Sequence, residues 1–142
     1  MEIELQNKYQ LYIGGQWKDA SDNATFKTFS PADGSLLAEC AEATREDVDE
    51  AVQAAWEAFA SWKNTTVNER AAVLNKIADI IDENTEFLAT VESMDNGKPV
   101  RETMAVDIPL SAQHFRYFAG CIMAEEGSAS ILGKATLRLI LR

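Results

Sequence analysis

The hydrophobic period of the chain changes at Thr44, and this change does most to constrain the fold. Before Thr44, short runs rich in aromatic, β-branched and aliphatic residues are separated by Gly and Pro turns. After Thr44, apolar residues recur three and four positions apart, which is the pattern of an amphipathic helix. The sequence therefore predicts short strands first and a layer of about four helices afterwards.

Turn residues divide the N-terminal part into two strand pairs. Gly14-Gly15 permits positive φ and predicts a tight hairpin turn. Pro31-Ala32-Asp33-Gly34 combines the fixed φ of Pro with Asp-Gly and favours a second turn. The predicted strands span residues 9–13 and 16–19 around the first turn and residues 25–29 and 35–41 around the second.

Two helix starts carry capping signals. Thr44 with Asp47, and Thr66 with Glu69, have the spacing of a capping box, in which each side chain bonds to the backbone N–H of the other residue. In the helix after Thr44, one face is apolar and is predicted to form part of a core. That face consists of Val48, Ala51, Val52, Ala55, Phe59 and Trp62.

The third helix has a start signal and a stop signal. We expect Asn84 to be its N-cap, because Asn is a preferred capping residue. Gly97 can take the left-handed conformation that ends a helix, and Pro99 blocks any continuation.

The fourth predicted helix is apolar on two faces. We expect Asp107 as its N-cap and Pro109 in its first turn, where the missing N–H has no helical partner. A helix that is apolar on two sides is buried on two sides, and a short chain covers only one easily. The pattern therefore predicts a missing partner surface. One face carries Ile108, Ala112, Phe115, Ala119 and Ile122, and the other carries Leu110, His114, Tyr117 and Cys121.

The C-terminal residues predict a strand that needs a partner. Within residues 131–142, Leu137, Leu139 and Leu141 alternate with other residues, and Gly133-Lys134 favours a hairpin turn. An apolar strand with nothing after it exposes an edge, which proteins usually pair or cover.

Composition excludes several classes of function. The chain has 13 basic and 23 acidic residues, and its net charge of −10 gives the wrong field for nucleic acid or an anionic membrane surface. There is no run of 18 apolar residues that would predict a membrane-spanning helix, and the first residues do not resemble a secretory signal. We therefore expect a cytoplasmic protein that binds neither nucleic acid nor membrane.

The residues themselves reveal no catalytic constellation. The sequence contains no glycine-rich phosphate loop. Its single histidine is His114, which we expect in the interior, because no nucleophile or carboxylate lies at a spacing from it that would indicate a catalytic pair. Cys40 in a predicted strand and Cys121 on an apolar helix face are expected to be buried, inert thiols. On these grounds alone, the chain is a strand-plus-helix module with uncovered surfaces.

Several segments nevertheless form a specific set when taken in order. They are LYIGGQW, FKTFSPADGSLLAECAEATREDVDEAVQAA, NERAAVLNKIADII, ESMDNGKP and DIPLSAQHFRYFAG, followed by EEG. This set resembles the N-terminal part of the aldehyde dehydrogenase family, and the likeness is gapless from Tyr9 to Gly127. DIPLSAQHFRYFAG is similar to the subgroup that oxidises acetaldehyde and other short aliphatic aldehydes.

The resemblance implies an α/β fold of the aldehyde dehydrogenase type, of which this chain holds the N-terminal part. Residues 1–127 would form the strand-plus-helix part, and residues 128–142 would form the first, incomplete part of the oligomerisation arm. The family continues with Glu-Pro into a dinucleotide-binding domain, so we expect this chain to be either truncated or a stand-alone remnant. The implied partners are the rest of the enzyme chain or like subunits in a homo-oligomer.

The chemistry of the family is the NAD- or NADP-dependent oxidation of an aldehyde to a carboxylic acid. A cysteine thiolate attacks the aldehyde, hydride passes to the nicotinamide, and a glutamate activates the hydrolytic water. The resemblance places this cysteine, this glutamate and the cofactor site beyond Arg142, and neither Cys40 nor Cys121 matches the nucleophile. We therefore expect no catalytic residue, no NAD(P) binding and no activity in the isolated chain.

Two minor sites carry over by resemblance. Thr28, Phe29 and Asp95 match positions that hold a structural monovalent cation, K⁺ or Na⁺, through main-chain carbonyls and one carboxylate, which are hard oxygen ligands. The alternative is that Asp95 only helps to end its helix. Val106 and Leu110 match positions that line the substrate tunnel, and a plain core leucine is the alternative for Leu110.

Two other functions stay open from the sequence. A non-catalytic binding or assembly module would use the two-sided helix and the edge strand to dock to another protein. An independent cation-binding domain would instead be stabilised by potassium or sodium.

Overall fold

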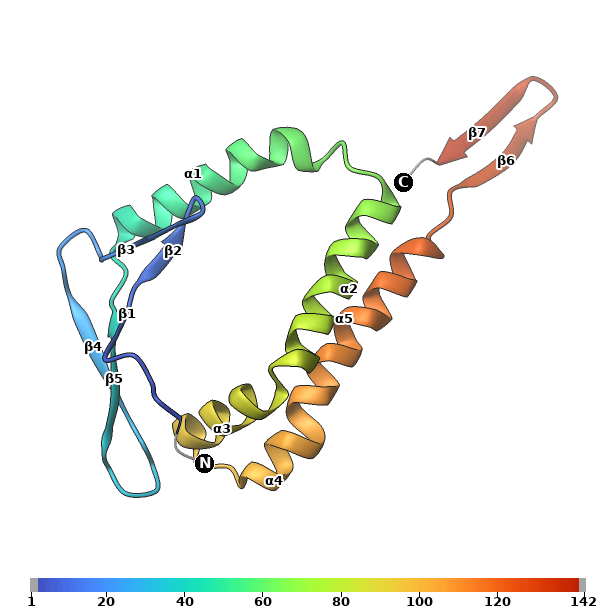
Figure 1. Cartoon of the computed structure of the whole chain (residues 1–142). Helices are drawn as coiled ribbons and strands as arrows, with labels where there is room; N and C mark the ends of the chain where they lie inside the picture. The colour runs from blue at the N-terminus through green and yellow to red at the C-terminus, as the bar shows by residue number, and fades with distance from the viewer. Residues whose placement is uncertain (1–2, 141–142) are drawn as a thin grey trace.

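The N-terminal strands form two small sheets in the computed structural model, which describes residues 3–140 (Figure 1). β2 and β3 form an antiparallel hairpin, while β5 pairs with β4 antiparallel and with β1 parallel, in the order β1-β5-β4. Both predicted strand pairs are confirmed, although Tyr9 belongs to the larger sheet and not to the hairpin. The strands are β1 (Lys8–Tyr9), β2 (Leu11–Ile13), β3 (Gln16–Lys18), β4 (Thr25–Phe29) and β5 (Leu36–Ala41).

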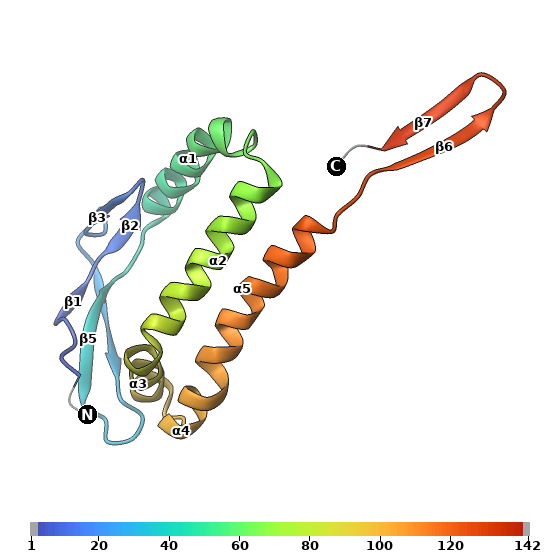
Figure 2. The ribbon, with the colours of Figure 1, turned by 45° about the vertical axis from the view of Figure 1, so that its right-hand side comes forward.

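The helices follow in one continuous run after β5. In Figure 2, α2 and α5 lie side by side, and α3 lies across the end of this pair, where α4 begins. The predicted layer of about four helices is confirmed, because α4, η1 and α5 continue one another. The helices are α1 (Arg45–Trp62), α2 (Val67–Glu83), α3 (Thr85–Asn96), α4 (Val100–Glu102), the π-helical turn η1 (Thr103–Asp107) and α5 (Ile108–Met123).

Both capping boxes are present. The backbone N–H of Asp47 donates to the Thr44 hydroxyl at 3.2 Å, and the Asp47 carboxylate accepts from the Thr44 N–H at 2.9 Å. Thr66 and Glu69 exchange the same two bonds at 3.2 and 2.6 Å. These reciprocal bonds satisfy N–H groups that have no partner within the helix, so they fix where α1 and α2 begin.

The boundaries of the third helix are as predicted, but the cap differs. Asn84 precedes α3, yet its side chain donates to the Ile80 carbonyl of α2 at 2.8 Å and makes no capping bond to α3. Gly97 ends the helix with φ +78°, the left-handed conformation expected of a C-cap glycine.

The predicted start of the fourth helix is wrong. Asp107 has helical φ and ψ angles of −66° and −49° and makes no capping bond, because the helix begins earlier, at Val100. It passes through η1 just before Pro109, whose ring and missing N–H do not fit a regular helix interior.

The core of the described part consists mainly of alanines. Ala71 and Ala78 on α2 and Ala112 and Ala119 on α5 are buried, and such small side chains allow two helices to approach closely. Arg116 of α5 adds ion pairs to the carboxylates of two α2 residues on the surface of this contact. These are Asp79 at 2.8 Å and Asp82 at 2.7 Å.

Large apolar side chains remain exposed on two helices. The predicted core face of α1 is not buried within residues 3–140, since Trp62 is 45% and Val48 52% exposed. On α5, the face that includes Leu110 and Tyr117 is exposed, whereas Ala112 and Ala119 face the interior. The prediction that only one face of this helix is covered is therefore confirmed.

The C-terminal strands form a hairpin that projects away from the helices (Figures 1 and 2). β6 (Ser128–Gly133) and β7 (Thr136–Ile140) pair antiparallel, and the side chains of Ile131 and Leu132 are exposed. The predicted hairpin is confirmed, while Leu141 and Arg142 lie outside the described residues. None of the described helices is long and apolar enough to cross a membrane.

Candidate functional site: the Thr28–Asp95 contact and the outer face of α5

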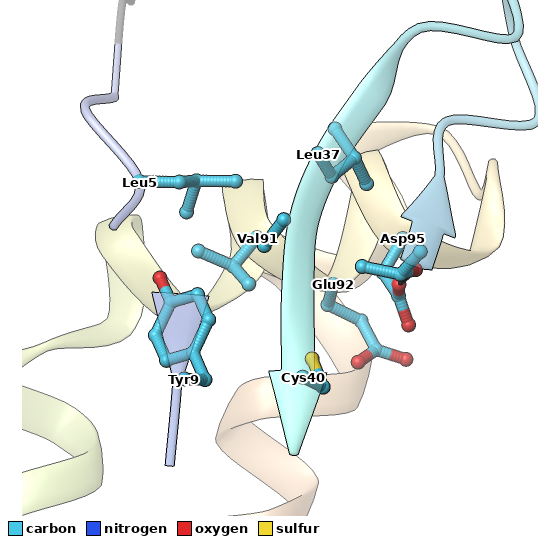
Figure 3. A pocket seen from close by; sticks show the side chains of 9 residues that line it. Leu5, Tyr9, Leu37, Cys40, Val91, Glu92 and Asp95 are labelled. Carbon is cyan, nitrogen blue, oxygen red and sulfur yellow. Dashed lines mark hydrogen bonds between the residues drawn. The ribbon is translucent and has the colours of Figure 1, made fainter. Parts of the chain in front are cut away.

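A small cavity of about 150 Å³ lies between the larger sheet and α3 (Figure 3). In Figure 3, Leu5, Tyr9 and Val91 lie to one side of β5, and the carboxylates of Glu92 and Asp95 lie to the other. The cavity therefore has a mainly apolar lining with two acidic groups, one helical turn apart on α3, at its polar end.

Two of the three predicted cation ligands are in contact. Thr28 lies on β4, and its Oγ1 donates a hydrogen bond of 2.8 Å to Oδ1 of Asp95 in the last turn of α3. Helix α3 thus brings a carboxylate, which accepts hydrogen bonds and can bind a hard cation, against the sheet.

The backbone at Thr28 and Phe29 departs from a regular ladder. The register shifts between these residues, with Thr28 opposite Ala38 and Phe29 opposite Leu36. Such an irregularity releases main-chain groups from strand pairing, and main-chain carbonyls are the ligands that the resemblance assigns to these two residues. The side chain of Phe29 is exposed and lies outside the cavity lining.

Glu92 was not among the predicted site residues. Its carboxylate accepts a bond of 2.6 Å from the Asn96 amide, and its side chain lines the same cavity as Asp95. The spacing of three residues on a helix was the signal that could have found it. Within residues 3–140, no group of three His, Cys, Asp or Glu side chains is arranged to hold a metal ion.

The two predicted tunnel positions lie on neighbouring turns of the last helix. Val106 lies in η1 and Leu110 in α5, and their side chains are 52% and 44% exposed. Leu110 is therefore only partly buried in the described part of the chain, and both interpretations, a tunnel residue or a core leucine, stay predictions.

An ion pair and a buried hydroxyl hold the start of this helix. Lys98 Nζ lies 2.8 Å from Oδ1 and 2.6 Å from Oδ2 of Asp107, and the carboxylate raises the pKa of the lysine. Thr103 is fully buried, and its hydroxyl donates to the Ala89 carbonyl of α3 at 2.8 Å. No role was predicted for Lys98 or Thr103, because both contacts depend on tertiary structure.

Three predictions about reactive side chains need correction. Cys121 and His114 are exposed on the outer face of α5, because no described element covers that face, and Cys40 is only partly buried. A hydrogen bond with the Cys121 side chain raises the pKa of Tyr117, one turn away on the same face. The described residues give neither thiol a histidine or carboxylate partner that would make it a catalytic nucleophile.

A sequence profile described as the aldehyde dehydrogenase family matches residues 17–141. The chain belongs to the aldehyde dehydrogenase family. It is 46% identical over 135 residues to an aldehyde dehydrogenase of Deinococcus radiodurans and 47% identical over 135 residues to an acetaldehyde dehydrogenase of Pseudomonas aeruginosa. Both alignments cover 95% of this chain.

The chain corresponds to only part of these aldehyde dehydrogenases. It spans 26% of the D. radiodurans protein and 27% of the P. aeruginosa protein, in the N-terminal part. The solved structure of PnpE in complex with nicotinamide adenine dinucleotide has 41% identity and a TM-score of 0.89, and the match covers 92% of this chain and 27% of PnpE. The predicted α/β fold of the N-terminal part is therefore confirmed.

Proposed function

We propose that this chain is the N-terminal segment of an NAD(P)-dependent aldehyde dehydrogenase that oxidises an aldehyde to a carboxylic acid. The main support is the family match over residues 17–141, together with the share of about a quarter that the chain makes up of its relatives. The name of the P. aeruginosa relative favours acetaldehyde or another short aliphatic aldehyde as the substrate. The NAD complex of PnpE favours NAD as the cofactor.

The exposed surfaces support the same proposal. Trp56 and Phe59 on α1 and Tyr117 and Phe118 on α5 are each about half exposed or more, although aromatic side chains normally supply core or interface area. A groove lined by Val52 and these two α1 side chains adds to the uncovered area. Faces of this kind mark interfaces, and the remaining part of the enzyme is the partner that we propose for them.

The isolated chain is expected to be inactive. The described residues contain no nucleophile with an adjacent base, and the resemblance places the catalytic cysteine, the glutamate and the cofactor site beyond Arg142. Purified chain should produce no NADH or NADPH from acetaldehyde above the rate without protein. A rate above that blank would contradict the proposal.

A fusion enzyme provides the positive test. Residues 1–142 would replace the corresponding part of the D. radiodurans aldehyde dehydrogenase, and the fusion should reduce NAD with acetaldehyde. The D. radiodurans remainder without this segment is the control and should be inactive. Replacing Cys40 and Cys121 by Ser in the fusion should leave the activity intact, because the nucleophile comes from the remainder. A soluble, folded fusion without activity would contradict the proposal.

The exposed second face of α5 also favours a second candidate, a non-catalytic assembly module. In that function Tyr117, Phe118 and the β6–β7 hairpin would dock to another protein, such as a full-length homologue. Molar mass measured after size exclusion distinguishes the two functions. A discrete complex with a full-length aldehyde dehydrogenase favours the module, whereas self-association or partial unfolding favours the enzyme segment.

A further inference from the structure

The buried residues of the α4–η1–α5 helix do not fit an uninterrupted α-helix. Thr103 and Ala112 are 0% and 1% exposed, and Figure 2 shows α2 and α3 on the same side of this helix. Nine positions at about 100° per residue would turn these two side chains to opposite sides of a regular helix. Something between them must change the rotational phase.

The π-helical turn makes this change. In η1 the N–H of Ile108 donates to the Thr103 carbonyl, a bond that encloses one residue more than an α-helical bond. One extra residue reduces the angle between Thr103 and Ala112 by about 100°, so both can face the same side. The same rotation turns the alternative apolar face, which includes Leu110 and Cys121, outward.

Without the turn, the other face would be selected. A regular helix in phase with buried Thr103 would direct Leu110, His114 and Cys121 towards α2, since these positions recur at intervals of 3.6 residues. The sequence thus has two apolar faces that could pack against α2, and the extra residue of the π-helical turn determines which of them does.

Two contacts hold the turn in place. The hydroxyl of Thr103 bonds to the Ala89 carbonyl at 2.8 Å and to the Val100 carbonyl at 3.0 Å, which anchors the start of the turn on α3. At the end of the turn, the Asp107 carboxylate binds the Lys98 ammonium. Oδ2 of Asp107 is buried and lies 2.6 Å from Nζ of Lys98, so the positive charge of Lys98 compensates it.

We infer that Lys98, Thr103 and Asp107 are positioning residues that fix the π-helical turn and thereby select the face of α5 that points outward. The structural part of this inference concerns this chain alone. Its functional part rests on the proposed function, in which the selected face presents Val106 and Leu110 to the aldehyde. The Lys98–Asp107 ion pair would then not contact the aldehyde. It would act by setting the rotation of the helix that carries these two residues.

A pair of deletions tests the phase. In a Pro109→Ala background, removing Ala105 converts the π-helical turn into an α-helical turn and keeps Thr103 and Ala112 on one side. Removing Ser111 instead leaves the turn and rotates the rest of α5. We expect the Ala105 deletion to melt within about 5 °C of its background and the Ser111 deletion to melt about 10 °C lower or more. Equal losses, or the reverse order, would overturn the inference.

Local hydrogen exchange tests the ion pair. Lys98→Gln should speed exchange of the Ile108 amide about tenfold or more, while the Ala119 amide on the α2-facing side should keep its rate. Lys98→Arg should restore slow exchange, because it keeps the charge. No change at Ile108, an equal change at Ala119, or no rescue by Arg would overturn the inference. These measurements need neither substrate nor cofactor, so an inactive fusion enzyme would count against the proposed function only.

Discussion

The hydroxyl of Thr28 donates a hydrogen bond of 2.8 Å to the carboxylate of Asp95, and this bond joins β4 to the last turn of α3. The two residues are 67 positions apart in the sequence. If the proposed cation site exists, the Asp95 carboxylate supplies its charge and this bond orients it. In the alternative interpretation, the carboxylate only helps to end α3, and its hydrogen bond with Thr28 is its only contribution to the fold.

A salt-dependent melting experiment tests the cation site. We expect KCl or NaCl to raise the melting temperature relative to tetramethylammonium chloride at the same ionic strength, because a ligand that binds only the folded state stabilises it. Asp95→Ala should abolish this difference, since it removes the charged ligand. Thr28→Val is the comparison variant: it loses the orienting hydrogen bond, worth about 0.5–1.5 kcal/mol, but keeps the carboxylate, and so should reduce the difference less than Asp95→Ala does. Equal behaviour of both variants in all salts would contradict a cation site.

Gly97 is predicted not to tolerate a side chain. Its φ is +78°, and an added Cβ would lie 2.8 Å from Cγ of Pro31. The left-handed conformation alone costs a residue with a Cβ about 1–2 kcal/mol, and the close contact adds to it. Gly97→Ala should therefore lower the free energy of unfolding by more than about 1 kcal/mol in urea melts.

Gly120→Ala is the matched control for this substitution. Gly120 lies within α5, and an added Cβ would meet nothing within 4 Å. Alanine should therefore stabilise the helix by about 0.5–1 kcal/mol. If both alanine variants shift stability in the same direction, the explanation from φ is wrong.

Asp47 is predicted to make stability depend on pH. The Thr44 N–H first, and then the Ser21 N–H, hold the pKa of the Asp47 carboxyl below its usual value of 3.8. Because the carboxylate is favoured in the folded state, its contribution is complete above the ordinary pKa of an aspartate. It is lost as the pH falls through the lowered pKa of the folded state.

Asp47→Asn should flatten the decline in stability of the chain below pH 4, as measured by melting at a series of pH values. Asp49→Asn is the control, because Asp49 lies on the same helix, is exposed, and contacts Arg45 only at 3.9 Å. The Asp49 variant should keep the pH dependence of the unchanged chain. An unchanged profile in the Asp47 variant would contradict the assignment.

Local signals made much of the fold predictable. The Gly14-Gly15 turn and the Thr66–Glu69 capping box are each determined by residues within a few positions, and both form as expected. The position of Gly97 at the end of α3 follows from the same kind of signal.

Tertiary contacts explain what could not be predicted. Asp107 looks like an N-cap in the sequence, but it lies inside a continuous helix, where its carboxylate pairs with Lys98 and makes no capping bond. The apolar face of α1 was predicted to form part of a core but is exposed in the described part of the chain, because periodicity does not reveal which part of a chain covers a face.

The candidate site was predictable only by resemblance. Nothing in the spacing of Thr28 and Asp95 indicates that they meet, because they lie on a strand and a helix that are separated in the sequence by one strand and two helices. Val106 and Leu110 were likewise assigned from the family pattern. Both side chains are exposed in the described part of the chain, and their role stays a prediction.

Leu110 and Ala112 are predicted to differ in how strongly a change in side-chain size affects stability. Leu110 is 44% exposed, so Leu110→Ala should change the free energy of unfolding by no more than about 0.5 kcal/mol. Ala112 is almost fully buried, and Ala112→Leu should destabilise by about 1–3 kcal/mol because the contact with α2 has no room for three more carbon atoms. Urea melts of the two variants measure both effects.

In the active fusion enzyme, Leu110→Ala should alter the relative kcat/KM for short and long aliphatic aldehydes, because a tunnel residue discriminates by the apolar contact it makes. A large loss of stability in the Leu110 variant, with no change in aldehyde preference, would mean that this leucine serves the core and not the substrate route.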